Sequence, residues 1–156
     1  MSKHHTNQEV IQKMEHFCAY QERCHQEVIQ KMRNMAMDSG NIDEIVVHLI
    51  QNNFLNEERF ACSFARGKHR IKHWGNVRIV NELKVRNISQ TNISIALKEI
   101  KSDEYFATFD ALGERHWLSI NEKNQLKKRK KFCDFMLRKG FESQLVYEKV
   151  KQLEND

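Results

Sequence analysis

Proline is absent from this chain of 156 residues, and glycine occurs only five times. Because proline interrupts helices and is common in loops, its absence favours a chain that is helical nearly throughout. No apolar run approaches the roughly 20 residues that are needed to cross a bilayer. The N-terminal stretch MSKHHTNQEV lacks the apolar core of a signal peptide, so we expect a cytoplasmic protein without a membrane contact.

The sequence also lacks the motifs of common enzymes. It contains no G-x-x-x-x-G-K, no G-x-G-x-x-G and no G-x-S-x-G. The cysteines form neither a C-x-x-C pair nor a dense framework, which favours reduced, partly buried thiols; they are Cys18, Cys24, Cys62 and Cys133. His69 and His73 lie four residues apart, as zinc ligands sometimes do, but no third ligand follows at a recognisable spacing. We therefore expect no enzyme, no cofactor and no metal site.

One pattern of apolar residues occurs three times along the chain. The segment RIVNELKVRNISQTNISIALKEI, from Arg78, aligns without a gap with KFCDFMLRKGFESQLVYEKVKQL, from Lys131, at an offset of 53 residues. A further copy begins at Val28, at an offset of 51. The aligned apolar positions are Ile79, Leu83, Ile88, Ile93, Leu97 and Ile100; Phe132, Met136, Phe141, Val146, Val150 and Leu153; and Val28, Met32, Met37, Ile42, Val46 and Leu49. Repeats of this length indicate a stack of supersecondary units.

Within LKVRNIS, Asn87 predicts a break between two helices. If Asn87 is the first residue beyond a helix, then Leu83 and Ile88 have the spacing of the apolar pair in a Schellman motif. In that motif the first residue beyond the helix, here Asn87, adopts positive φ, which glycine tolerates best and asparagine next. Gly140 occupies the same position in the third copy, so we expect positive φ at Asn87 and Gly140.

The first copy departs from this pattern at Ala36, which suits positive φ poorly. We expect the helix before Ala36 to end differently or to continue. Ser89 and Asp38 are the predicted N-caps of the helices that follow the breaks, because their side-chain oxygens can accept from free backbone N–H groups. Asn56 is the predicted N-cap of the helix that precedes the middle copy.

A further helical stretch precedes each copy. Apolar side chains at helical spacing form a stripe in each of these stretches: Val10, Met14 and Phe17; Phe60 and Phe64, with Ala61 and Ala65 beside them; and Tyr105, Phe106 and Phe109. We interpret the stripes as core. The sequence therefore predicts an all-α fold of about nine helices in three tandem three-helix repeats, residues 1–53, 54–101 and 102–156. One such unit buries too little apolar surface to be stable alone, so we expect neighbouring units to stack and share core.

Positive charge is concentrated in the middle repeat. Residues 1–53 carry 5 Lys and Arg against 7 Asp and Glu, residues 54–101 carry 10 against 4, and residues 102–156 carry 11 against 10. The run RGKHRIKHWGNVR supplies the candidate residues for binding a partner or DNA: Arg66, Lys68, Arg70, Lys72, Trp74 and Arg78. Trp74 and Gly75 fit either such a contact or a packed corner between helices. We predict that this run provides most of the working surface.

The run KKRKK adds the candidates Lys127, Lys128 and Arg129. On a helix, five consecutive cations are distributed over more than half of the circumference, so they cannot all face one flat partner surface. The run is therefore either solvated surface or an electrostatic contact with nucleic acid or an acidic protein.

Three segments resemble the family of the bacterial regulatory protein RecX: FCAYQERCHQEVIQKM, FLNEERFACSFARGKHRIKHWGNVRIVNELKVRNIS and FMLRKGF. The resemblance runs from about Phe17 to the C-terminus. Its most specific residues are Phe54, Leu55, Arg59, Phe60 and Ala61, followed by Gly75, Arg78, Ile79, Glu82 and Leu83. The chain departs from the family at Cys24, where serine is frequent, and at Asn56 and Glu57, where an aspartate is usual.

The resemblance implies tandem three-helix units in a curved, elongated array and a role in homologous recombination, DNA repair and the SOS response. Members of the family modulate the RecA recombinase, generally by lodging in the groove of its filament on single-stranded DNA and restraining filament growth, ATP hydrolysis or strand exchange. The implied partner is thus RecA, with direct DNA contact as a further option, and we expect a monomer.

Two alternatives to a RecA regulator stay open at the level of sequence. One is a free-standing nucleic-acid-binding protein whose second and third helices act like a helix-turn-helix. Its third helix, TNISIALKEI, offers few base-reading side chains beyond Asn92 and Lys98. The other is a purely structural helical adaptor.

Overall fold

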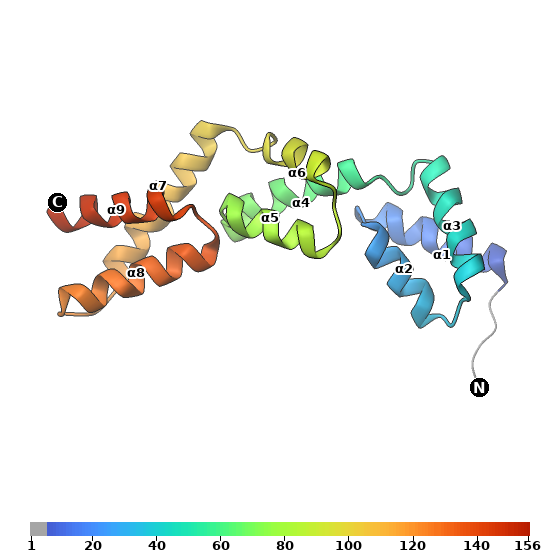
Figure 1. The fold of residues 1–156 in the computed structure, drawn as a ribbon, viewed down its shortest axis with the longest axis horizontal. Helices are drawn as coiled ribbons and strands as arrows, with labels where there is room; N and C mark the ends of the chain where they lie inside the picture. Colours follow the sequence, from blue (N-terminus) through green and yellow to red (C-terminus); the bar gives the residue numbers. More distant parts are fainter. Residues whose placement is uncertain (1–5) are drawn as a thin grey trace.

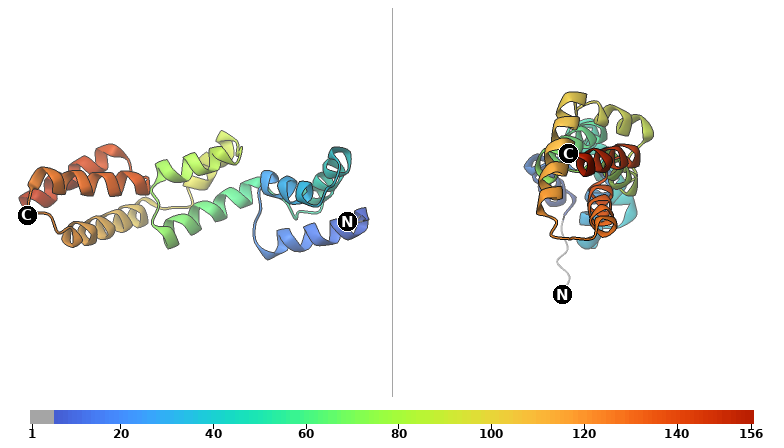
Figure 2. Two further views of the ribbon diagram at one scale, coloured as in Figure 1. Left: turned by 90° about the horizontal axis from the view of Figure 1, so that it is seen from below. Right: turned by 90° about the vertical axis from the view of Figure 1, so that its left-hand side faces the viewer.

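A computed structural model describes residues 6–156, and this range folds into nine α-helices with no strand (Figure 1). The helices are α1 (Asn7–Tyr20), α2 (His25–Asn34), α3 (Ser39–Gln51), α4 (Glu57–Lys72), α5 (Asn76–Val85), α6 (Gln90–Leu97), α7 (Ser102–Ser119), α8 (Gln125–Lys139) and α9 (Ser143–Asn155). They form three groups arranged end to end, so that the molecule is elongated (Figures 1 and 2). We call these groups the first unit (α1–α3), the middle unit (α4–α6) and the third unit (α7–α9). The predicted all-α array of three-helix repeats is confirmed.

The aligned apolar positions form the core of the array. All of them are buried or half-buried, and only Met37, Val46, Leu97 and Leu153 belong to the half-buried class. The four cysteines are also buried and free, in agreement with the interpretation as reduced thiols. None of the helices in the described part of the chain is long and apolar enough to cross a membrane.

The buried side chains form two hydrophobic clusters. The first unit has its own cluster, which includes Met14 and Leu49. The other cluster runs without interruption through the middle and third units, and Cys24 is the one buried residue that the first unit adds to it. The predicted sharing of core between units therefore holds strongly for the middle and third units. One residue of the predicted stripes is misplaced: Phe106 is 45% exposed, because it directly follows the buried Tyr105 and so points about 100° away from it around α7.

The helix ends at Asn87 and Gly140 have the predicted geometry. Asn87 has φ 60° and Gly140 has φ 101°. The N–H of Ile88 donates to the carbonyl oxygen of Leu83 at 3.1 Å, and the N–H of Phe141 donates to that of Met136 at 3.3 Å. These are the long hydrogen bonds of the Schellman motif, so both helix ends confirm the prediction.

The prediction for Ala36 is wrong, because this alanine also adopts positive φ, at 58°. The N–H of Met37 donates to the carbonyl oxygen of Met32 at 3.2 Å, as in the other two copies. Met32 is fully buried and Met37 is half-buried, so the apolar pair of the motif is retained. The hydrogen bonds and this apolar contact outweigh the cost of about 1 kcal/mol that a left-handed alanine carries.

The predicted N-caps are confirmed at all three positions. The side chain of Ser89 accepts from the N–H of Asn92, that of Asp38 from the N–H of Asn41, and that of Asn56 from the N–H of Arg59. Each cap satisfies one of the backbone N–H groups that a helix start leaves without an internal partner.

Candidate interaction surface

Helix α4 ends at a tight turn that leads into α5, and this turn lies beside the third unit. His73 has φ 58° and turns the chain through Trp74 and Gly75 into α5. His69, one turn earlier, is fully buried; its Nδ1 donates to the carbonyl oxygen of Trp74 at 2.9 Å, and its ring stacks on that of Tyr105 at 5.3 Å between centroids. His69 and His73 are therefore packing and turn residues. Within residues 6–156 no group of three His, Cys, Asp or Glu side chains could hold a metal ion.

The start of α5 is capped by the end of α8. The N–H of Gly75 donates to the carbonyl oxygen of Lys139 at 2.8 Å, and the N–H of Val77 donates to that of Gly140 at 2.9 Å. Gly75 has no side chain with which to cap α5, so carbonyl groups from the third unit take this role. The positive end of one helix dipole thus meets the negative end of another, which stabilises the contact between the two units.

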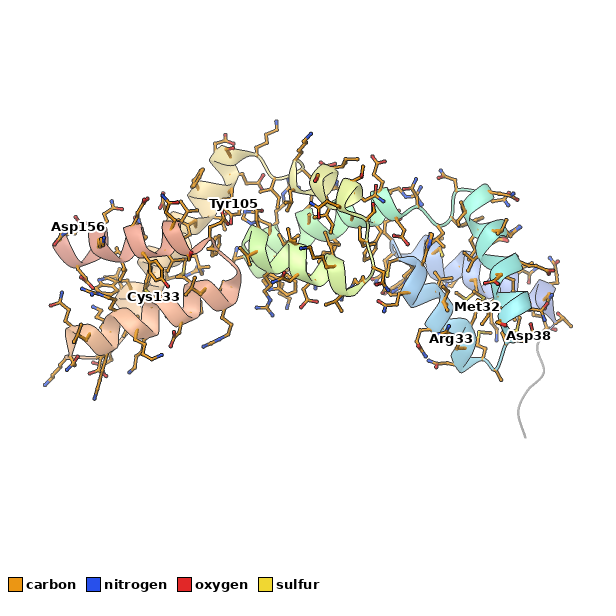
Figure 3. The ribbon with its side chains drawn as sticks, viewed as in Figure 1. Met32, Arg33, Asp38, Tyr105, Cys133 and Asp156 are labelled. Carbon is orange, nitrogen blue, oxygen red and sulfur yellow. The ribbon has the colours of Figure 1, made fainter. Side chains whose placement is uncertain are left out.

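A polar network lies beneath the same contact. The hydroxyl of Tyr105 accepts from the N–H of Asn76 at 3.0 Å and donates to the carboxylate of Glu142. Burial and the hydrogen bond to Glu142 raise the pKa of Tyr105, so the phenol stays neutral. Figure 3 shows Tyr105 on α7 facing the middle unit. The network and the capped start of α5 make the middle and third units one continuous structure.

Five side chains gather on the outside of this contact, and we call them the Trp74 cluster: Lys68, Lys72, Trp74, Arg78 and Lys139. The Nζ atom of Lys68 lies 5.0 Å from the centre of the Trp74 ring, and the guanidinium carbon of Arg78 lies 4.2 Å from it. The ammonium of Lys139 donates to the carbonyl oxygen of Lys72 at 3.0 Å. Two cations of the middle unit thus lie over the Trp74 ring, and a cation of the third unit adjoins Lys72.

The Trp74 cluster has an excess of positive charge. Burial, followed by the charges of Arg78, Lys72 and Arg115, lowers the pKa of Lys139. None of the four cations forms an ion pair with a carboxylate in the described range. Since uncompensated like charges repel one another, an anionic partner at this surface gains attraction and relieves the repulsion.

The other two candidates on α4 have partners within the chain. Arg66 pairs with Glu99 at 3.3 Å, and Arg70 pairs with Glu104 at 2.9 Å. The hydrogen bond from Arg70 also lowers the pKa of Glu104. These two arginines are therefore less available to an outside partner than Lys68 and Lys72 are.

An apolar side chain adjoins the cluster on α4. Lys68 and Lys72 line a surface groove of about 370 Å³ together with Ile71. The side chain of Ile71 is 76% exposed. Single exposed apolar side chains are common on protein surfaces, so Ile71 adds only apolar area beside Lys68 and Lys72.

The second basic run lies at the opposite end of α8. Arg129 makes two hydrogen bonds to Glu154, at 2.6 and 2.7 Å, and Lys128 lies over the ring of Trp117 at 4.0 Å. Lys127 is exposed. With a rise of about 1.5 Å per residue, Lys127 and Lys139 are about 18 Å apart along the helix. The structure thus brings Lys68, Lys72, Trp74 and Arg78 together and separates them from Lys127, Lys128 and Arg129.

Lys139 is the residue of the surface that the sequence analysis did not identify. It directly precedes Gly140 in FMLRKGF, a segment that the repeat alignment placed at a helix end. The repeat pattern carries no indication that this helix end contacts α5, because the contact joins two different units.

The structure therefore defines an elongated array of three-helix units with a basic surface where two units meet. A family model described as RecX, second three-helix domain, matches residues 56–97, and one described as RecX, third three-helix domain, matches residues 103–150. Together these segments cover more than half of the chain. The chain belongs to the RecX family, whose members are regulatory proteins.

Individual relatives agree with this assignment. The regulatory protein RecX of Bacillus cytotoxicus is 24% identical over 143 residues, which cover 90% of this chain and 53% of the relative. RecX of Pelodictyon phaeoclathratiforme is 27% identical over 112 residues, which cover 72% of this chain and 68% of that protein. The chain thus spans about half the length of the Bacillus relative.

Solved structures show the same fold. A crystal structure of a regulatory protein RecX superposes with a TM-score of 0.82 at 18% identity, covering 94% of this chain and 73% of that chain. The crystal structure of RecX from Lactobacillus salivarius superposes with a TM-score of 0.79 at 21% identity, covering 96% of this chain and 97% of that chain. The end-to-end arrangement of three-helix units is therefore common to all three.

Proposed function

We propose that this chain binds RecA filaments on single-stranded DNA and restrains their activity, with the Trp74 cluster as its main contact. The family assignment supports a regulatory role. The single observation that carries the choice of surface is the gathering of four cations without carboxylate partners where the middle and third units meet, two of them over the Trp74 ring.

The shape and stiffness of the chain suit a partner with an extended surface. An end-to-end array presents its side chains over a long distance, as tandem repeat proteins generally do. The cluster lies where the middle and third units are fixed by backbone hydrogen bonds, so its cations are held in place before a partner arrives. Positive charge of this kind accelerates association with an acidic protein surface or with DNA phosphates.

The direct test is the rate of ATP hydrolysis by RecA on single-stranded DNA, with and without this protein. Inhibition at amounts well below those of RecA supports capping of the filament or binding in its groove. An unchanged rate of hydrolysis at every amount, together with unchanged strand exchange, would contradict the proposal.

Charge variants locate the working surface. We expect the triple variant Lys68→Ala, Arg70→Ala, Lys72→Ala to lose inhibition, and the variant altered to alanine at Lys127, Lys128 and Arg129 to keep it. A Lys68→Ala, Lys72→Ala, Lys139→Ala variant should lose as much as the first, because Arg70 already pairs with Glu104. Helicity is compared first by circular dichroism. If only the Lys127 variant loses inhibition, the working surface lies at the start of α8.

A free-standing nucleic-acid-binding protein is the second candidate, because the same cations can meet phosphates. In that case removal of three cations from the cluster flattens the dependence of DNA affinity on salt by about three counterions. DNA binding without any effect on RecA would favour this candidate. If the cations meet acidic RecA side chains instead, their removal slows association with RecA and leaves any residual DNA binding nearly unchanged.

A further inference from the structure

A second surface, remote from the Trp74 cluster, lies on the first unit. Helix α1 borders an open groove of about 690 Å³. The side chains that form its floor and rim include Lys13, His16, Phe17, Tyr20, Arg23 and Lys31. In Figure 1 α1 and α2 lie at the end of the array that is opposite to α8 and α9.

The charge of this groove is opposite to that of the segment that contains it. Residues 1–53 carry more Asp and Glu than Lys and Arg, with 7 against 5. Three of those five basic residues, Lys13, Arg23 and Lys31, nevertheless line the groove, and Glu9 is the one carboxylate among its lining residues. The fold therefore concentrates positive charge on one face of an acidic unit.

The three cations are not neutralised by carboxylates of the described chain. None of them takes part in an ion pair among residues 6–156. Two of them lie on the Phe17 ring instead: the guanidinium carbon of Arg23 is 3.7 Å and the ammonium of Lys31 is 4.8 Å from the ring centre. Nε of Arg23 also donates to the carbonyl oxygen of Phe17 at 3.0 Å, which fixes the guanidinium on the ring.

An exposed aromatic side chain lies beside these cations. Tyr20, at the end of α1, is 77% exposed. The groove thus combines an exposed aromatic ring with three cations that can form ion pairs with an anionic partner.

We infer that this groove binds a short acidic segment of a partner protein that carries one aromatic or large aliphatic anchor. The anchor packs against Tyr20 and the edge of Phe17, where it removes apolar surface from water. The carboxylates of the segment pair with Lys13, Arg23 and Lys31. Apolar anchors surrounded by complementary charge are the usual basis of such binding.

Single-stranded nucleic acid fits this groove less well. Proteins that bind it without sequence preference stack successive bases on successive free aromatic rings. Here the ring of Phe17 is already in contact with Arg23 and Lys31, so Tyr20 is the one six-membered ring of the lining that is left for stacking, beside the smaller imidazole of His16. A peptide needs only one anchor, and the observed arrangement provides for one.

This inference goes beyond the proposed function, and its test needs no RecA. Fluorescence anisotropy of the full chain compares three labelled probes: a peptide rich in Asp and Glu with a central Trp, the same peptide with Ser in place of Trp, and oligothymidylate. We expect saturable binding of the Trp peptide that weakens as salt is added, and binding of the Ser peptide that is about tenfold weaker.

Variants place the peptide in the groove. Tyr20→Ala and the double variant Lys13→Gln, Lys31→Gln should each weaken binding of the Trp peptide about tenfold, and the double variant should also reduce its salt dependence. The matched controls are Tyr147→Ala, a half-exposed tyrosine on α9, and Lys84→Gln, Lys151→Gln, both exposed lysines on helices; these should leave binding unchanged.

Three results would overturn the inference. They are a Trp peptide that does not bind the wild-type chain, peptide binding that the Tyr20 and Lys13 variants leave unchanged, and tight binding of oligothymidylate that these same variants abolish. The last result would assign the groove to nucleic acid. None of the three bears on inhibition of RecA by the Trp74 cluster, so the two proposals fail independently.

Discussion

Gly75 at the start of α5 lies directly against Gly140 at the end of α8. A Cβ atom on Gly75 would overlap the carbonyl group of Gly140, and a Cβ atom on Gly140 would overlap the backbone and Cβ of Arg78. Two glycines are therefore required where the middle and third units meet. Gly140 has two independent constraints, since its positive φ also favours glycine.

The first prediction concerns Gly75→Ala, which forces the two backbones apart. Its added methyl group meets main-chain atoms that cannot move aside, so we expect a loss of about 2–3 kcal/mol in the free energy of unfolding. Urea unfolding followed by circular dichroism measures it. Gly67→Ala is the control: nothing lies within 4 Å of its Cβ, so this substitution on α4 should stabilise by about 0.5–1 kcal/mol. Equal effects of the two substitutions would contradict the close approach.

The second prediction concerns the left-handed helix ends. Ala36→Gly should stabilise the chain by about 0.5–1 kcal/mol, because glycine relieves the strain of positive φ at this position. Asn87→Gly should be neutral or slightly stabilising, whereas Gly140→Val should cost on the order of 1 kcal/mol or more. Thermal or urea unfolding tests all three. Ala111→Gly, at an exposed helical position on α7, should destabilise by about 0.5–1 kcal/mol, and the same sign at Ala36 would contradict the prediction.

The third prediction concerns Tyr105→Phe, which removes the donor to Glu142 and the acceptor for the N–H of Asn76. We expect a loss of about 1–3 kcal/mol near pH 7, because buried polar groups are left without partners. Urea unfolding measures the loss. Tyr147→Phe, on an exposed part of α9, is the control and should have little effect.

The same variant tests the pH dependence. The pKa of Tyr105 is raised in the folded chain, so its contribution to stability is fully present below the ordinary tyrosine pKa of 10.0 and is lost as the pH rises above it. Stability of the wild-type chain should therefore fall more steeply between pH 9 and about 11 than that of Tyr105→Phe. Parallel curves for the two proteins would show that Tyr105 ionises as readily in the folded chain as in the unfolded one.

The fourth prediction concerns Arg59, which joins the first unit to the middle unit. Its Nε donates to Glu22 at 2.6 Å, and its Nη atoms donate to the side chain and carbonyl oxygen of Asn53 at 3.1 and 3.0 Å. A single ammonium group cannot reproduce this fork, so Arg59→Lys should lose nearly as much stability as Arg59→Ala, about 1–2 kcal/mol.

Hydrogen exchange locates the effect of Arg59. Both substitutions should speed exchange of the backbone amides around Asn53 and Phe54, where the units are connected, and leave α8 unchanged. Arg115→Lys, an exposed position on α7, is the control and should stay within about 0.5 kcal/mol of the wild type. Full stability of Arg59→Lys would show that charge alone, rather than the fork, holds the two units together.

The sequence by itself was sufficient for the helices, for the repeat and for the helix ends at Asn87 and Gly140. The break at Asn87 depends on Leu83 and Ile88, and the cap at Ser89 depends on the N–H of Asn92, all within a few residues of one another. The apolar positions of the three copies predict one face of each helix, because burial in a stacked array repeats with the unit. Interactions between residues that are this close in the sequence can be predicted from the sequence alone.

The arrangement of the candidate basic residues was only partly predictable. The sequence does not distinguish the four cations of α4, which are Arg66, Lys68, Arg70 and Lys72. In the structure, however, Arg66 pairs with Glu99 and Arg70 pairs with Glu104. The partner of Arg70 lies 34 residues away, and the contact between Lys139 and Lys72 spans 67 residues. Such pairings depend on the way in which whole units are placed against one another.

The positive φ of Ala36 and the exposure of Phe106 are likewise properties of the folded chain. Intrinsic preference disfavours a left-handed alanine, but the buried Met32 and the cap at Asp38 fix the turn around it. Phe106 has the composition of a core residue, and the direction in which α7 packs turns it outward. Propensities and spacing therefore determined the elements, whereas the placement of Lys139 beside Lys72 and Arg78 was decided by the close backbone contact that Gly75 and Gly140 permit between two units.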